Sequence, residues 1–373
     1  MKHLLSILAL ALVAVPFAQA QAQVQARWDG KQLALNPVWT RVADVFGEAG
    51  SVESVEFSPD SRFLASGTKF DNTVIIWRTS DGTEVWRQTL PQEIERVGWS
   101  PNGEFVASVS EDFMARVFRA EDGTLVHELP HDSGIDGLAW SHNGRFMATG
   151  AEWTEDADGR HGYLRLYAMP GATLAQTLDL GDTINSIDFS SDDTFVLGAG
   201  HGAVAVWRLE DGTEVQRLTN SIDPSIHFIS ARFSPDDQLL VAGDNDGNVH
   251  LWDWETGELL RVFDRSGHKI EIVEWTPDGQ YLATAGNDPF IRLFRTADML
   301  GEDRIYTALQ VFAGDQAEYL HFNALGSLMA SAHQDGLIRL WVFMSEDPTV
   351  NARRHEMVKA QQRAAAQARE DSR

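Results

Sequence analysis

The stretch FSPDDQLLVAG, residues 233–243, is one of seven copies of a pattern in which an aromatic residue precedes a polar turn and a short apolar run. The other copies are FSPDSRFLASG (57–67), WSPNGEFVASV (99–109), WSHNGRFMATG (140–150), FSSDDTFVLGA (189–199), WTPDGQYLATA (275–285) and FNALGSLMASA (322–332). Their leading aromatics are 42, 41, 49, 44, 42 and 47 residues apart. Seven units of this period predict an all-β fold, a seven-bladed β-propeller of four-stranded antiparallel blades.

Each repeat carries the signals of four strands. Apolar residues five and two positions before the leading aromatic, such as Val52 and Val55, mark a first strand. Pro-Asp, Asn-Gly or Asp-Gly pairs then favour a tight turn into a second strand. A third strand and a further turn precede an outer strand. The third strands end in an aromatic residue at Trp77, Phe118, Tyr167, Trp207, Trp252, Phe294 and Trp341.

The repeats resemble the WD-repeat family of β-propellers. NVHLWDW, residues 248–254, contains the Trp-Asp pair of that family, whereas Arg78 and Arg208 replace the aspartate in two other units. The resemblance covers about residues 40–343. It implies a scaffold that binds a protein or peptide partner through one loop-rich face, without catalysis of its own.

The chain divides into four predicted segments. Residues 1–20 resemble a secretory signal peptide cleaved near Ala20, which predicts a periplasmic or secreted protein. Residues 21–39 form a lead segment, 40–345 the propeller, and 346–373 an Ala/Gln/Arg-rich tail, helical or disordered. The last unit lacks an outer strand, so we predict that residues 40–46 supply it and close the ring.

Charge and composition exclude several kinds of partner. The net charge is −25 and there is no cysteine. Nucleic acid and anionic membranes are bound through Lys and Arg, so neither is an expected partner. The sequence carries no P-loop, dinucleotide or G-x-S-x-G motif, and we predict no cofactor.

The string HELPH, residues 127–131, matches the zinc-protease motif H-E-x-x-H. That motif requires a helix, and Pro130 would break one at a cost of about 3 kcal/mol. In a strand the two histidines would lie roughly 13 Å apart at about 3.3 Å per residue, too far to share an ion. We therefore interpret HELPH as a strand end, with His131 at the position of the family's Gly-His histidine.

A carboxylate recurs six residues before the third-strand aromatic. In the resembled family this aspartate braces the turn between the second and third strands, and the matching residues here are Asp71, Asp112, Asp246, Asp288 and Asp335. Blades 3 and 4 instead have His161 and His201 at this position. Blade 3 also contains about eight inserted residues within 151–163.

These departures select the candidate partner-binding residues on one loop face. They are Phe70, Phe113, Trp153, Arg160, His161, His201, His227 and Phe290. Exposed Trp and Arg dominate interaction hot spots, although a variable loop without function is an equal alternative. A second hypothesis is a metal-binding or metalloenzyme propeller, with His161 and His201 as the candidate ligand pair.

Overall fold

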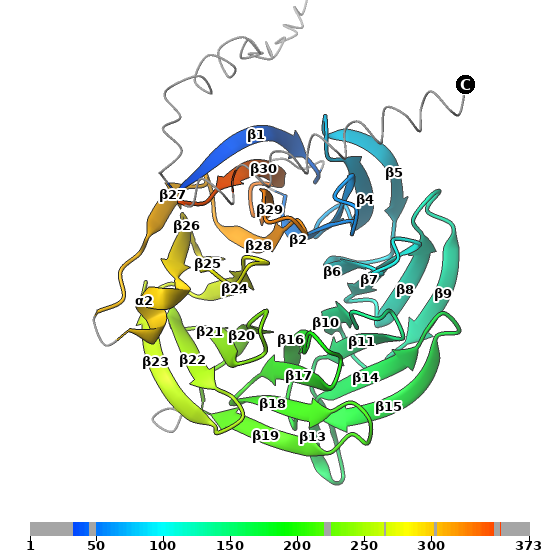
Figure 1. The fold of residues 1–373 in the computed structure, drawn as a ribbon. Helices are drawn as coiled ribbons and strands as arrows, with labels where there is room; N and C mark the ends of the chain where they lie inside the picture. Colours follow the sequence, from blue (N-terminus) through cyan, green and yellow to red (C-terminus); the bar gives the residue numbers. More distant parts are fainter. Residues whose placement is uncertain are drawn as a thin grey trace, which may run out of the picture.

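The computed structural model describes residues 33–44, 50–219, 225–264, 266–301, 304–346 and 351. Seven four-stranded antiparallel sheets surround a central axis (Figure 1), which confirms the predicted seven-bladed propeller. The predicted signal peptide and almost all of the C-terminal tail lie outside the described residues. No helix among the described residues has the length and apolar character needed to cross a membrane.

The blades follow one another along the chain, each running from the axis outward. Blade 1 contains β2 (Val52–Phe57), β3 (Phe63–Thr68), β4 (Thr73–Arg78) and β5 (Thr83–Thr89). Blade 2 contains β6 (Ile94–Trp99), β7 (Phe105–Ser110), β8 (Met114–Arg119) and β9 (Leu125–Pro130). Blade 3 contains β10 (Ile135–Trp140), β11 (Phe146–Ala151), β14 (Tyr163–Ala168) and β15 (Thr173–Asp179). The residues inserted in blade 3 form a separate hairpin of β12 (Thr154–Asp156) and β13 (Gly159–His161).

Blades 4 to 7 repeat the arrangement. They contain β16 (Ile184–Phe189), β17 (Phe195–Gly200), β18 (Ala203–Arg208), β19 (Glu214–Thr219); β20 (Phe228–Phe233), β21 (Leu239–Asp244), β22 (Asn248–Asp253), β23 (Glu258–Asp264); β24 (Ile270–Trp275), β25 (Tyr281–Gly286), β26 (Asp288–Arg295), β27 (Leu309–Phe312); β28 (Ala317–Phe322), β29 (Leu328–His333), β30 (Leu337–Met344) and β1 (Ala34–Val42). The short helix α2 (Thr296–Leu300) joins β26 to β27. We call the face with the inter-blade loops and the turns from second to third strands the top face, and the opposite face the bottom face.

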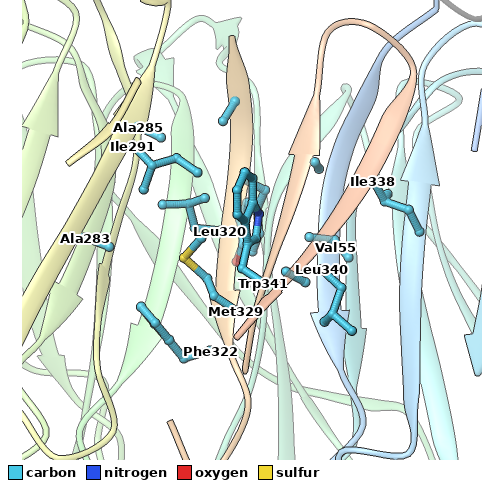
Figure 2. Close-up of a cluster of buried hydrophobic side chains, with 14 of the residues drawn as sticks. Val55, Ala283, Ala285, Ile291, Leu320, Phe322, Met329, Ile338, Leu340 and Trp341 are labelled. Carbon is cyan, nitrogen blue, oxygen red and sulfur yellow. The ribbon is translucent and has the colours of Figure 1, made fainter. Parts of the chain in front are cut away.

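The core lies between the blades, because each sheet buries both of its faces against its neighbours. In blade 7, Met329 and Trp341 lie on the side of blade 6, while Ile338 and Leu340 lie toward Val55 of blade 1 (Figure 2). The third-strand aromatics are all buried. Where the neighbouring strand offers a hydroxyl, the indole is anchored: Trp77 Nε1 donates to Ser66 Oγ at 2.9 Å. The aromatic repeat is therefore the inter-blade packing unit.

The first and last described strands pair with each other. β1 runs antiparallel to β30 from Ala34 opposite Met344 to Val42 opposite Leu337. This strand begins six residues before the predicted closing segment 40–46, and the propeller boundary moves from residue 40 to the start of β1. Pro37 obscured the strand in the sequence, but β1 is an edge strand with a register shift beside Pro37, where a missing N–H is tolerated.

Asp44 links the closing strand to blade 1. Its side chain is fully buried, and its Oδ2 accepts hydrogen bonds from the backbone N–H groups of Ser51 (3.3 Å) and Phe70 (3.0 Å). A Cβ on Gly50 would lie 2.6 Å from the Asp44 side chain, so glycine is required for this close approach. The end of β1 is thereby fixed to the first blade as well as to the last.

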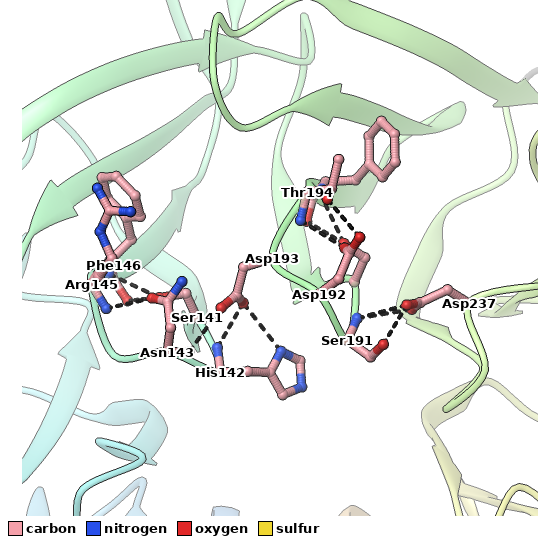
Figure 3. A network of polar contacts seen from close by, with 12 residues as sticks. Ser141, His142, Asn143, Arg145, Phe146, Ser191, Asp192, Asp193, Thr194 and Asp237 are labelled. Atoms are coloured by element: carbon pink, nitrogen blue, oxygen red, sulfur yellow. Dashed lines mark hydrogen bonds and ion pairs between the residues drawn. The ribbon is translucent and has the colours of Figure 1, made fainter.

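Turns on the bottom face connect neighbouring blades (Figure 3). Asp193 Oδ1 accepts a hydrogen bond from His142 N (2.7 Å), and its Oδ2 accepts one from Asn143 N (2.8 Å). Asp237 Oδ1 likewise accepts a hydrogen bond from the backbone N–H of Ser191 at 2.9 Å. Both aspartates have φ near +56°, and at this turn position blades 2, 3, 6 and 7 have glycine while blade 1 has Ser61. In blades 4 and 5, an aspartate in this strained conformation thus accepts hydrogen bonds from the turn of the preceding blade.

Removing residues 1–42, and with them β1, should abolish cooperative thermal unfolding, because blades 7 and 1 would lose their shared packing and an unpaired strand edge would open. Calorimetry with circular dichroism measures this. Replacing the β12–β13 hairpin with a short linker is the control, since it removes no blade strand. An unchanged, single-transition melt after loss of β1 would contradict the closure.

Substituting Asp193→Gly should lower the free energy of unfolding by about 1–3 kcal/mol, since glycine keeps the positive φ but loses the charge-assisted hydrogen bonds to blade 3. Urea denaturation compares this variant with Asp158→Gly, an exposed aspartate of the β12–β13 hairpin, which should stay near the wild-type value. Equal stability of the two variants would show that the bottom-face contact contributes nothing.

Candidate functional site

Three aromatic side chains stand exposed on the top face of adjacent blades. Phe70 lies in the β3–β4 turn of blade 1, Phe113 in the β7–β8 turn of blade 2, and Trp153 just after β11 of blade 3. Their exposed fractions are 52%, 46% and 42%. Large apolar side chains of this kind supply anchors in protein interfaces. The sequence selected all three from their place in predicted turns.

The inserted hairpin is fastened across the top of blade 3. The Arg160 guanidinium lies 3.9 Å from the ring centre of Trp153, and Arg160 also pairs with Asp182 at 2.6 Å. The backbone N–H of Trp153 donates to Thr183 Oγ1 at 3.1 Å. The stacked guanidinium and the ion pair orient Trp153, so less side-chain freedom would be lost when a partner binds it.

Asp182 extends this arrangement to a pair of histidines. Its Oδ2 lies 3.1 Å from His201 Nδ1, and the rings of His201 and His227 stack with centres 4.0 Å apart. Burial, and then the neighbouring His201, lowers the pKa of His227. A continuous polar and aromatic surface thus runs from Trp153 to His227, across blades 3 to 5.

His161 has different neighbours from His201. Its Nδ1 lies 2.6 Å from Asp179 Oδ2 and its ring stacks on Tyr163, and the bond to Asp179 raises the pKa of His161. Among the described residues, the groups of three or more potential metal ligands contain no histidine. The histidine metal centre proposed from the sequence is therefore not supported, because each imidazole is directed to its own carboxylate.

Phe290, predicted in a loop of the top face, lies in a blade strand instead. It belongs to β26, where it is half-buried and packs edge-on against Phe312 of β27 with ring centres 5.9 Å apart. The prediction of a loop is wrong here because β26 already begins at Asp288. Phe290 therefore packs between β26 and β27 and is less available to a partner than the three exposed aromatics.

The recurring turn carboxylates bind the backbone or side chains of the turn that joins the second and third strands. Asp71 accepts from Thr73 Oγ1 at 2.9 Å, and Asp112 pairs with Arg116 at 2.7 Å. Asp288 and Asp335 pair in the same way with Arg292 and Arg339. In blade 5 the bonding carboxylate is the buried Asp244 instead of the exposed Asp246. Its Oδ1 accepts from Asp246 N and Asn248 N, and its Oδ2 lies 2.8 Å from His250 Nε2.

HELPH lies on β9 and the loop that follows, in extended conformation. His127 Nε2 contacts the carbonyl of Pro170 at 2.8 Å, whereas His131 Nε2 contacts Thr149 Oγ1 at 2.7 Å. The two rings thus have separate partners on different elements. Burial lowers the pKa of His131 to about 4, so this imidazole is neutral and structural.

A set of acidic residues at the mouth of the central channel escaped the sequence analysis. Every innermost strand has a register shift that leaves its second residue unpaired, and such a bulge redirects the side chain. The residues at this position are Glu53, Glu95, Asp136, Asn185, Ile229, Glu271 and Glu318. Their signal, a carboxylate four residues before the leading aromatic in five of seven units, could have been found by aligning the repeats on that aromatic.

These carboxylates repel one another, and their titration is displaced. Burial, and then Glu53 and Asp136, raises the pKa of Glu95 to about 8. Burial, and then the nearby carboxylates, raises that of Glu111 to about 7. Deeper in the channel, burial raises the pKa of Glu56 to about 8, beside a layer in which Arg232 donates to Glu274 at 3.3 Å. The carboxylates at the mouth of the channel are therefore close enough to repel one another when they are ionised.

Comparison with known proteins supports the repeat assignment. A family model described as the anaphase-promoting complex subunit 4 WD40 domain matches residues 55–143 and 190–277. The seven-bladed chain is similar to WD40-repeat proteins. It is 24% identical over 261 residues to actin-interacting protein 1 of Drosophila melanogaster, covering 68% of the chain and 35% of that protein.

Other relatives of this chain are similarly distant. Identity is 25% over 257 residues to transcription initiation factor TFIID subunit 5 of Caenorhabditis elegans, covering 68% of the chain and 32% of that protein. It is 26% over 151 residues to small ribosomal subunit protein RACK1y of Oryza sativa subsp. japonica, covering 40% of the chain and 43% of that protein. The chain spans less than half the length of each of these relatives, so they support the repeat architecture and no specific partner.

The raised carboxylate pKa values predict that this propeller is more stable at pH 6.5 than at pH 8.5. Glu56, Glu95 and Glu111 hold protons in the folded state at pH values where the unfolded chain, with pKa near 4.5, has lost them. Stability therefore falls as pH rises through this window. Buried histidines oppose this trend only near pH 6.5, where about half of the imidazoles of the unfolded chain are charged, and they are neutral in both states at higher pH.

The measurement is the melting temperature in EDTA-containing buffers of constant ionic strength between pH 6.5 and 8.5. The variant Glu111→Gln, which cannot ionise, should show a smaller dependence on pH. A melting temperature that rises with pH in the wild type would contradict the assigned shifts.

Proposed function

We propose that this protein is an exported scaffold that binds a protein or peptide partner through its top face, without catalysis of its own. The observation that carries the proposal is the exposure of Phe70, Phe113 and Trp153 on one face of three adjacent blades. The WD40 homologues are typically protein-interaction scaffolds, which supports the same class of function. The signal-like residues 1–20 support export.

The three aromatics have different surroundings, which suggests a division of roles. Trp153 is oriented by Arg160 and lies beside the His201–His227 pair, so it would act as the anchor. Phe70 and Phe113 lie in the corresponding turns of blades 1 and 2, and Phe113 follows Glu111 by two residues. A partner segment that crosses this face would place apolar side chains on the aromatics and basic side chains near the carboxylates, since complementary charge speeds and orients association.

The test is affinity purification with chemical crosslinking from the native host, comparing wild type with Phe70→Ala, Phe113→Ala and Trp153→Ala, singly and combined. Each substitution should weaken the same partner, and Trp153→Ala should cost about 2 kcal/mol or more, as truncated aromatic anchors do. The changes are exposed, so folding should be retained, which a thermal melt verifies.

Tyr306→Ala is the matched control. Tyr306 is an aromatic residue exposed by 66%, and it lies in the α2–β27 connection of blade 6, away from the three top-face aromatics. Loss of the partner with the triple variant and its retention with Tyr306→Ala would support the top face. Identical partner sets for all variants would rule out this surface.

A further inference from the structure

A groove lies between blades 1 and 2 on the bottom face. Its volume is about 960 Å³, at the upper end of the usual range for ligand-binding clefts. The turns β2–β3, β6–β7 and β8–β9 form its walls, and the outer strands β5 and β9 also line it. The apolar side chains along it are Phe63, Ile76, Val85, Trp99, Phe105 and Val126.

Two valines of this groove have no apolar cover. Val85 and Val126 are the bulged residues of the outer strands of blades 1 and 2, because strand pairing skips each of them. Their exposed fractions are 41% and 38%. The corresponding bulge residues of blades 4 and 5, Val215 and Leu260, are half-buried and pack against the hydrophobic core. The groove thus lacks apolar packing that blades 4 and 5 have at the same position.

The inner wall of the groove contains a hydrogen-bond donor. Trp99 is only 5% exposed, and its ring stacks on Phe63 with centres 6.4 Å apart. Its Nε1 has no hydrogen-bond partner among the described residues, whereas the corresponding Trp140 donates to the Gly98 carbonyl at 3.3 Å. Buried donors are normally paired, so this one favours a ligand that supplies an acceptor. A peptide backbone supplies a carbonyl oxygen at every residue.

The rim of the groove is acidic. Glu104 and Glu121 lie there, and neither forms an ion pair in the part of the chain that the structure describes. The two arginines of the rim are already engaged, because Arg62 and Arg119 each pair with an aspartate of their own turn. An apolar groove with such a rim favours a peptide whose apolar residues are flanked by basic ones.

The chain itself contains a segment of this composition. Residues 352–373 contain six Lys or Arg and three Asp or Glu, in a chain whose net charge is −25. Met357 and Val358 lie between Arg354 and Lys359. The charge of this segment is therefore complementary to the rim.

The same segment begins on the face that carries the groove. β30 ends on the bottom face, where Ser345 N donates to Asn351 Oδ1 at 3.0 Å and Asn351 Nδ2 donates to the Ser345 carbonyl at 2.6 Å. Blades 7, 1 and 2 follow one another around the ring (Figure 1). Neighbouring sheets pack about 10 Å apart, whereas seven extended residues span about 23 Å. Val358, seven residues beyond Asn351, is therefore within reach of the groove across blade 1.

We propose that residues 352–373 bind in this groove of the same chain. Met357 and Val358 would contact the apolar side chains. The basic residues on either side of them would pair with Glu104 and Glu121. This contact would link blade 7 to blades 1 and 2 across the point where the ring closes. It lies on the bottom face and does not depend on the partner proposed for the top face.

The test is disulfide trapping in the full chain, which has no cysteine of its own. One variant combines Ala360→Cys with Leu125→Cys, next to Val126. The control combines Ala360→Cys with Leu259→Cys, the corresponding residue of blade 5, which is equally exposed (43% against 44%) and also lies two blades from blade 7. Mass spectrometry follows disulfide formation in dilute solution with oxidised glutathione. The Leu125→Cys pair should close at least about tenfold faster, because binding raises the local concentration of the tail thiol.

Charge reversal at the rim provides a second readout. Glu121→Lys should slow formation of the disulfide at Leu125→Cys by about two- to fivefold, as loss of an exposed ion pair does. Glu255→Lys, in the corresponding turn of blade 5, is the matched control and should leave the rate unchanged. Equal rates for the two cysteine pairs, disulfides formed mainly between two chains, or equal effects of the two charge reversals would each overturn the proposal. Thermal melts under reducing conditions verify that every variant folds.

Discussion

Each blade has two apolar faces, and neither can be left in water, so the stability of every sheet depends on having a neighbour on both sides. In an open row of blades, the first and last sheets would each expose one such face. The pairing of β1 (Ala34–Val42) with β30 (Leu337–Met344) removes both ends together. Trp39 extends the contact, because its indole N–H donates to the Thr79 carbonyl of blade 1 at 2.9 Å. The closed ring then holds the loops of the top face at fixed separations.

The differences between blades lie mainly in the loops of the top face, where a changed side chain disturbs the buried core least. Blades 1 to 3 carry Phe70, Phe113 and Trp153 and two groups of clustered carboxylates, whereas blades 4 and 5 carry the stacked His201 and His227. The bulge in each inner strand determines that its second residue faces the mouth, whatever that residue is. Repeated backbone geometry with varied side chains therefore produces a surface that differs from blade to blade.

Much of the fold could be predicted from the sequence because the same turn residues and aromatic positions recur in all seven repeats. Turn residues, leading aromatics and third-strand aromatics all lie where the spacing places them. The limits of β1 were missed, since Asn36 and Pro37 are poor strand residues whose strand conformation depends on the distant β30. Asp246 and Phe290 were misplaced for a related reason. Counting residues from the nearest aromatic cannot reveal that Asp244, and not Asp246, binds the turn backbone in blade 5. Nor can it reveal that Phe290 lies within strand β26.

By itself the sequence determined the number of blades, the strand order within each blade and the side chains available on the top face, because these follow from short-range periodicity and turn chemistry. Only the tertiary structure decided which carboxylates meet. Glu111 and Asp136 are 25 residues apart and come together through a bulge, an inter-blade turn and the missing side chain of Gly134. Likewise, Arg160, Asp182 and His201 form one connected surface only because the blade 3 hairpin folds over the adjoining loop. Such contacts depend on the closed ring, and no single repeat encodes them.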